Sequence, residues 1–103
     1  MIPLIEQNRE TIGELCRRYG VERLEVFGSA ADDTFDIEHS DIDFIVEFLP
    51  GQDLGPWLAH YHDLRDELER LLGRDIDLVM AGAPKNPWFL RELNRTRKVL
   101  YAA

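Results

Sequence analysis

Hydrophobic residues recur at helical spacing at both ends of the chain, and residues that start or stop helices bound each run. Residues 4–19 form the first predicted helix, which Gly20 ends. Near the C-terminus, Asn86 and Pro87 are a typical helix start, and they predict a helix over 87–95.

A longer helix is predicted over residues 55–72, with Pro56 in its first turn and Gly73 as its C-terminal stop. The two tryptophans of the chain, Trp57 and Trp88, both lie near predicted helix starts, and we expect them to be core or interface anchors. The apolar stripe of this helix comprises Trp57, Leu58, Tyr61, Leu64, Leu68, Leu71 and Leu72.

Alternating or continuous apolar runs between the helices predict strands over residues 22–27, 41–48 and 75–79, with a short edge strand over 99–101. Residues 28–40 form a turn and an acidic loop between the first two strands. This order of elements predicts an α/β (α+β) domain, in which a small mixed β-sheet has helices packed on it.

Two pairs of polar residues constrain the strand directions. Gly28 and Ser29 leave the first strand, whereas Asp41 and Asp43 enter the second, so these residues meet only if the two strands are antiparallel. Asp43 and Asp77 both lie near strand starts, which predicts parallel pairing joined by a right-handed helical crossover. We therefore expect a mixed sheet with the site at one end.

Composition limits the function classes. The chain has 103 residues, 45% of them hydrophobic, which predicts a single domain over 1–103 with one core. Its formal net charge of −8 repels nucleic acid, so no direct nucleic-acid binding is expected, and a polymerase or tRNA-tailing enzyme acting alone is disfavoured. An acidic surface suits association with a basic protein partner.

The single cysteine, Cys16, cannot form an internal disulfide and lies on the apolar side of a predicted helix, where a core position is expected. The N-terminus lacks a signal-peptide pattern, and no apolar run is long enough to cross a bilayer. These features predict a cytoplasmic protein. Neither a P-loop nor a Rossmann glycine motif is present.

The most informative chemistry is the pair Asp41 and Asp43, which project from the same face of a strand roughly 7 Å apart. Two carboxylates this close favour a divalent cation, and Mg²⁺ typically combines one or two carboxylates with substrate phosphates. Alone, an Asp-x-Asp pair is more often a solvated turn. Its combination with Gly28-Ser29 before it and Asp75-Ile76-Asp77 after it indicates a metal site facing a phosphate.

These three segments, Phe27-Gly28-Ser29, Ser40–Val46 and Ile76–Val79, resemble the signature of the DNA-polymerase-β-like nucleotidyltransferase superfamily. The small size is similar to its minimal nucleotidyltransferase (MNT) branch, and the resemblance covers roughly residues 4–101. It implies a polymerase-β-like core that transfers AMP from ATP to a hydroxyl, typically a tyrosine of a partner HEPN-domain toxin, so that the chain acts as an antitoxin.

The resemblance also implies the site residues. Asp41, Asp43 and Asp77 would be catalytic and bind two Mg²⁺ ions, and Gly28, Ser29 and Ser40 would bind the nucleotide. Asp75 shares a face with Asp77 and is the rival third ligand. Ser40 is also placed to be a turn or cap residue. His39, in the acidic loop, could reach the site, although a surface position is expected for it.

One departure from the family pattern bears on activity. Asp32 and Asp33 stand where the family commonly has an Arg-Gly pair, and two acids there should weaken binding of a triphosphate. Compensating positive charge is expected from one or more of four basic residues, Arg23, Lys85, Arg97 and Lys98.

Two other functions compete with adenylyl transfer. The first is an antitoxin that is catalytically weak or inactive and neutralises its toxin by binding alone. The second, a small-molecule nucleotidyltransferase, is disfavoured because a chain of 103 residues has no room for a separate substrate domain.

Overall fold

The structure is a computed structural model that describes residues 1–36, 38 and 40–103, so the expectation for His39 falls outside the described residues. Its four strands are β1 (Val21–Phe27), β2 (Ile42–Phe48), β3 (Ile76–Met80) and β4 (Lys98–Ala102). The helices are α1 (Pro3–Gln7), α2 (Arg9–Arg18), α3 (Ser29–Asp32), α4 (Ala59–Leu72) and α5 (Pro87–Thr96), and a 3₁₀ turn, η1 (Pro56–Leu58), precedes α4.

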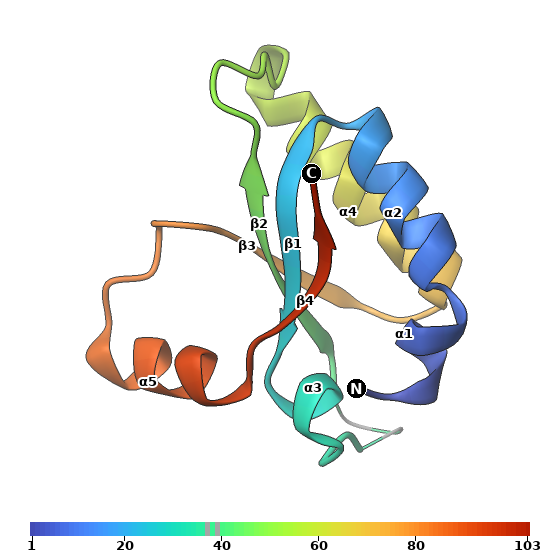
Figure 1. Cartoon of the computed structure of the whole chain (residues 1–103), viewed down its shortest axis with the longest axis vertical. Coiled ribbons are helices and arrows are strands. Elements are labelled where there is room, and N and C mark those ends of the chain that lie inside the picture. The colour runs from blue at the N-terminus through green and yellow to red at the C-terminus, as the bar shows by residue number, and fades with distance from the viewer. Residues whose placement is uncertain (37, 39) are drawn as a thin grey trace.

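The four strands form one mixed sheet in the order β3-β2-β1-β4. β1 pairs with β2 and with β4 in antiparallel fashion, whereas β2 and β3 are parallel. Both predicted strand directions are therefore confirmed, and the last strand lies at an edge as expected (Figure 1).

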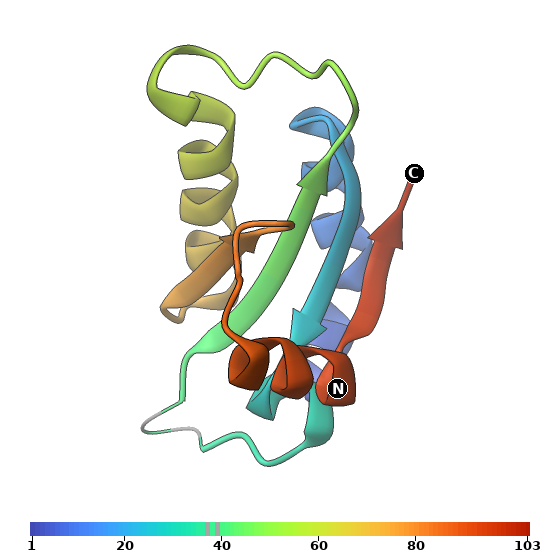
Figure 2. The ribbon, with the colours of Figure 1, turned by 90° about the vertical axis from the view of Figure 1, so that its left-hand side faces the viewer.

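Helices cover both faces of this sheet. α2 and α4 lie side by side on one face, and α5 lies on the other (Figures 1 and 2). The main core lies under α2 and α4 because alternate residues of β1 and β2, such as Leu24, Val26 and Phe44, point to that side and are fully buried. A smaller cluster of Phe27, Ile45 and Leu93 joins α5 to the opposite face.

The first helix differs from its prediction. Residues 4–19 form two helices rather than one, with a break at Asn8, whose φ of −109° and ψ of 10° are not helical. The side-chain amide of Asn8 donates to the carbonyl of Leu4 at 2.8 Å. Asparagine side chains compete in this way with backbone hydrogen bonds, which explains a break that hydrophobic spacing cannot predict.

The start of the long helix also differs. α4 begins at Ala59, and Trp57 and Leu58 before it have positive φ angles of 55° and 56°. Trp57 is 93% exposed and therefore does not belong to the apolar stripe, and Trp88 is 74% exposed. Neither tryptophan is a core residue, so the core alternative of that expectation is wrong for both.

Two further expectations concern Cys16 and membranes. Cys16 is buried, as predicted, and burial raises the pKa of its thiol to about 12. Within the described part of the chain, no helix has the length and apolar character that a bilayer crossing requires.

Candidate active site

The carboxylates predicted to form the site lie where β2 and β3 begin. Asp43 and Asp77 are direct register partners in the parallel β2–β3 pair. Paired residues of neighbouring strands point to the same face, so these two carboxylates project side by side from the face that carries α5. Asp41 immediately precedes β2, two residues before Asp43. The fold thus places at one end of the sheet three side chains that are up to 36 positions apart in the sequence.

The electrostatics of Asp43 indicate that these charges interact. Its pKa is raised from 3.8 to about 6, first because the side chain is partly buried, and then because Asp77 and Asp41 are negatively charged neighbours. Asp77, rather than Asp75, is therefore the third carboxylate that interacts with Asp43. Asp75 contributes its backbone carbonyl, which accepts the N–H of Ile42 at 3.2 Å.

Gly28 approaches this cluster from the end of β1. Its neighbour Phe27 is the register partner of Asp43, so the end of β1 lies beside the start of β2. Gly28 has φ of +71°, and a Cβ atom there would lie 2.9 Å from Oδ2 of Asp43. Any other residue would be strained and would press against the carboxylate, so the position requires glycine.

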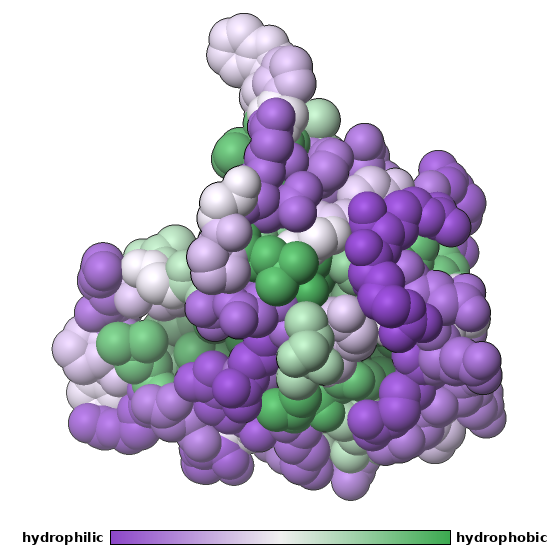
Figure 3. Space-filling view, turned by 45° about the horizontal axis from the view of Figure 1, so that its top comes forward, coloured by the Kyte–Doolittle hydropathy of each residue, from purple (hydrophilic) through white to green (hydrophobic). Residues whose placement is uncertain are grey.

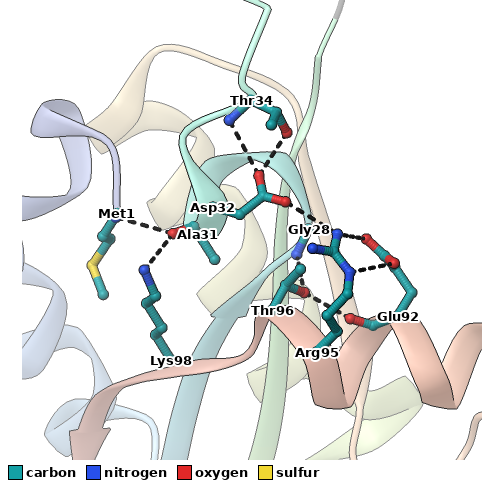
Figure 4. Close-up of polar contacts among 9 residues, drawn as sticks. All are labelled: Met1, Gly28, Ala31, Asp32, Thr34, Glu92, Arg95, Thr96 and Lys98. Carbon is teal, nitrogen blue, oxygen red and sulfur yellow. Dashed lines mark hydrogen bonds and ion pairs between the residues drawn. The ribbon is translucent and has the colours of Figure 1, made fainter.

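The backbone N–H of Gly28 is already engaged. It donates to Oγ1 of Thr96 at 2.8 Å, and the Thr96 hydroxyl donates to the carbonyl of Glu92 at 2.8 Å (Figure 4). Thr96, the last residue of α5, is 97% buried. The sequence analysis missed Thr96, since its role depends on the packing of α5 against the end of β1.

The contact between Gly28 and Thr96 also limits which of the predicted nucleotide-binding residues can donate a hydrogen bond to a phosphate. With the Gly28 N–H held by Thr96, Ser29 is the residue that has both a backbone N–H and a hydroxyl at the start of α3. Ser40 is part of the loop structure, because its Oγ accepts the N–H of Asp36 at 2.9 Å and its own N–H donates to the Asp36 carbonyl. The expected turn role of Ser40 is therefore present.

Asp32 has a cationic partner that the sequence analysis did not consider. Arg95 Nη2 lies 3.2 Å from Asp32 Oδ2, and it also contacts Glu92 one turn earlier in α5 (Figure 4). The Thr34 hydroxyl, which donates to Asp32 at 2.6 Å, is the largest cause of the lowered pKa of Asp32, and Arg95 adds to it. Asp33 in turn lies 3.3 Å from the N-terminal amino group of Met1. Asp32 and Asp33, the two acids that depart from the family pattern, thus both have cationic partners.

Three of the four basic residues expected to compensate are occupied elsewhere. Arg97 makes a two-pronged contact of 2.7 and 2.8 Å with the buried carboxylate of Glu25, and Arg23 lies 2.8 Å from the same group. Lys98 donates to the carbonyl of Ala31 at 2.7 Å, close to the end of α3 (Figure 4). Arg23 and Arg97 therefore neutralise Glu25 in this structure.

Lys85 is the remaining candidate. It lines a pocket of about 440 Å³ together with Val79 and Phe89, on the same side of the sheet as the carboxylates. Val79 is two residues beyond Asp77 in β3 and shares its face. A second pocket of about 570 Å³, lined by residues such as Ile2, Phe35 and Leu72, contains none of the predicted site residues.

The donor set fits Mg²⁺ chemically. Carboxylate oxygens are hard ligands, and the pKa of Asp43 is raised by burial and, after it, by repulsion from Asp77 and Asp41 that a divalent cation relieves. Within the described ranges, no three His, Cys, Asp or Glu side chains already form a group able to hold an ion. A bound cation would have to draw the three carboxylates together.

Comparison with known proteins gives a consistent result. Residues 9–100 match the family described as nucleotidyltransferase domain. The protein adenylyltransferase MntA of Thermococcus cleftensis is 38% identical over 73 residues, which is 71% of this chain and 69% of that protein.

Two solved structures show the same fold. One, described provisionally as a minimal nucleotidyltransferase, is 31% identical with a TM-score of 0.72, and the match covers 94% of this chain and 95% of that one. The other comes from a tri-AMPylated Shewanella oneidensis HEPN toxin in complex with its MNT antitoxin, and it has 21% identity and a TM-score of 0.63. That match covers 95% of this chain and 72% of the other.

Proposed function

This chain belongs to the nucleotidyltransferase domain family, and we propose that it is a metal-dependent protein adenylyltransferase that silences a partner toxin. The observation that carries the proposal is the electrostatic coupling of Asp41, Asp43 and Asp77 at the adjoining starts of β2 and β3. Like charges this close lower the stability of the fold, which is typical of a functional site. Gly28 leaves space beside Asp43, and carboxylates next to such a space suit metal-assisted chemistry at phosphorus.

Asp41, Asp43 and Asp77 are the residues that would hold Mg²⁺, two ions in the family pattern. When bound, the metal supplies positive charge that stabilises the negative charge developing on the phosphates and on the leaving pyrophosphate. Ser29 would donate its backbone N–H and hydroxyl to the β- and γ-phosphates. Gly28 leaves room for them beside Asp43, and Thr96 holds the Gly28 peptide in place.

In the proposed reaction, the oxygen of the acceptor hydroxyl attacks the α-phosphorus of ATP. The bond between the α-phosphorus and the bridging oxygen breaks, pyrophosphate leaves, and AMP remains on the acceptor. The hydroxyl proton passes to a carboxylate, for which Asp77 is placed best because it lies on the same face as Asp43 and is exposed to an incoming substrate.

We propose that the acceptor is a tyrosine of a HEPN-domain toxin and that the reaction takes place in the cytoplasm, where ATP is available. The tri-AMPylated HEPN toxin of the Shewanella oneidensis complex supports a HEPN-domain acceptor, and the adenylyltransferase name of the Thermococcus cleftensis relative supports AMP transfer to a protein. The acidic surface of the chain, with a net charge of −8, suits a basic protein acceptor.

The test is transfer of label from α-³²P-ATP, in the presence of Mg²⁺, to the protein encoded beside this gene, which the proposal expects to be a HEPN-domain toxin. Asp43→Asn should abolish labelling, and the matched control Asp75→Asn should retain it because Asp75 is not among the carboxylates coupled to Asp43. A tight complex that never acquires label would refute the proposal. That result would instead favour neutralisation by binding alone.

A further inference from the structure

The connection between β2 and α4 places a large aromatic side chain in solvent. Trp57 is 93% exposed and Leu58 is 45% exposed, in a tip that we define as residues 56–58. The end of the molecule that carries this connection rises above the body, and a narrow projection stands clear of the surface (Figures 1 and 3). A tryptophan is on average highly buried, so nearly complete exposure in this tip calls for an explanation.

The backbone of the tip is unfavourable for these residues. Trp57 has φ of 55° and ψ of 31°, and Leu58 has φ of 56° and ψ of 44°. Left-handed backbone brings the Cβ atom too close to the neighbouring carbonyl, and side chains other than glycine rarely adopt it twice in succession. Strain of this kind persists only where the surroundings impose it, and it gathers at functional positions.

Hydrogen bonds tie the chain to the body on both sides of the tip. The N–H of Gly55 donates to Oδ1 of Asp53 at 2.8 Å, and the N–H of His60 donates to the carbonyl of Leu54 at 2.9 Å. The hydroxyl of Tyr61 in α4 donates to the carbonyl of Leu78 in β3. The backbone on either side of the tip is therefore tied to the body, and an aromatic side chain, with only two χ angles, loses little conformational entropy on binding.

Charge around the tip indicates the kind of partner. Asp53 and Asp63 are the nearest Asp, Glu, Lys or Arg residues on its two sides in the sequence, and no Lys or Arg occurs between Arg23 and Arg65. The charged residues of the segment on either side of the tip are therefore acidic, and such a segment repels anionic lipid surfaces and nucleic acid. It also disfavours a second copy of a chain whose net charge is −8. A protein with an apolar cavity rimmed by Lys and Arg is complementary to it.

We propose that Trp57, supported by Leu58, is the anchor by which this chain docks into an apolar cavity with a basic rim on its toxin partner. The inference rests on the proposed function for the identity of the partner, but not for the mode of docking. Buried tryptophans dominate the binding energy of many interfaces, and surrounding charged residues contribute orientation and association rate.

Binding of the neighbouring HEPN-domain protein, measured by calorimetry without ATP, tests the proposal. Trp57→Ala should weaken binding by at least about 30-fold, the loss that defines an interface hot spot. Trp88→Ala is the matched control, because it removes the other exposed tryptophan and should leave the affinity within about threefold. Trp57→Gly should weaken binding equally while its melting temperature stays the same or rises, since glycine accepts the left-handed backbone without strain.

Fluorotryptophan in this chain alone gives a second readout that a structural role would not move. The two tryptophans give two ¹⁹F resonances, and only that of Trp57 should shift when the partner is added. Unchanged affinity of Trp57→Ala, or a Trp57 resonance that stays solvent-exposed in the complex, would overturn the inference. So would self-association of the free chain that Trp57→Ala abolishes, or no binding of the HEPN-domain protein at all. Intact binding without AMP transfer would instead overturn the proposed function and leave the docking inference standing.

Discussion

Replacing Asp43 with Asn should stabilise the chain when no metal is present. Asp43 is ionised at neutral pH although burial and two neighbouring carboxylates, Asp77 and Asp41, raise its pKa from 3.8 to about 6. Asparagine has nearly the same shape and no charge, so the substitution removes the repulsion without leaving a cavity. A group whose purpose is to bind a cation should in this way oppose folding while the cation is absent.

The size of the effect follows from the pKa. A rise from 3.8 to about 6 corresponds to about 3 kcal/mol of unfavourable interaction in the ionised state. Asp43 is only partly buried, so solvent screens part of this interaction, and we expect a gain of about 1–2 kcal/mol in the free energy of unfolding. For a domain of this size, that gain corresponds to a rise of about 5–10 °C in melting temperature.

The sign of the pH dependence follows from the same shift. Because the folded-state pKa of Asp43 lies above its ordinary value, the folded chain binds this proton more tightly than the unfolded chain. The ionised carboxylate therefore lowers stability at pH values above about 6, and the loss disappears as the pH falls below about 4. The advantage of Asp43→Asn over the natural chain should accordingly be largest near pH 8 and shrink steadily toward pH 4.

Thermal unfolding with a chelator, followed by circular dichroism across this pH range, measures the difference. Asp75→Asn is the control, since its carboxylate is not among those that raise the pKa of Asp43 and its removal should give no such pH-dependent gain. Mg²⁺ should then raise the melting temperature of the natural chain more than that of Asp43→Asn. A variant that melts below the natural chain near pH 8 in chelator would refute the reasoning, because it would mean that the Asp43 charge stabilises the fold.

Three further predictions concern the surroundings of this cluster. Gly28→Ala should lower the free energy of unfolding more than Gly51→Ala in urea titrations: both glycines have positive φ, but a Cβ at Gly28 meets Asp43 Oδ2 at 2.9 Å whereas one at Gly51 meets nothing within 4 Å. Equal losses would contradict the close approach. Thr96→Val should cost about 1–3 kcal/mol in the same titrations, because the partly buried Gly28 N–H loses its acceptor, and a neutral outcome would mean that water replaces the hydroxyl. Cys16 should resist a thiol reagent near pH 8 until the chain unfolds, since burial raises its pKa to about 12, and rapid labelling of the folded chain would contradict this.

The sheet and the carboxylates could be predicted from the sequence because their signals are local. Strands show themselves by alternation, and the requirement that Gly28 and Asp77 both meet Asp43 determined the directions of β2 relative to its two neighbours. The parallel pairing then places Asp77, rather than Asp75, opposite Asp43. The strand directions were thus predicted from the expected chemistry, and the structure confirms them.

The failures share one physical cause, which is that a side chain's partner is set by tertiary packing. Trp57 has the spacing of a core residue, yet two left-handed residues turn the chain before α4 begins and leave it in solvent. Arg97 was one of four basic residues from which compensating charge was expected, but it pairs instead with the buried carboxylate of Glu25. The spacing of residues along the sequence cannot show whether Trp57 is buried or which carboxylate Arg97 contacts.

Two residues at the end of α5 contact the candidate site although they lie outside the motifs that predicted it. Thr96 orients the Gly28 peptide from within the protein, and Arg95, one residue earlier, reaches Asp32 at the end of α3. Since Arg95 is exposed, the pair adds little to stability. Its consequence is electrostatic instead: the field of Asp32 near the start of α3 is offset by a cation from a segment more than 60 positions away. An acid at position 32 is therefore compatible with an anionic substrate near Ser29, provided that α5 stays docked against Phe27 through Leu93.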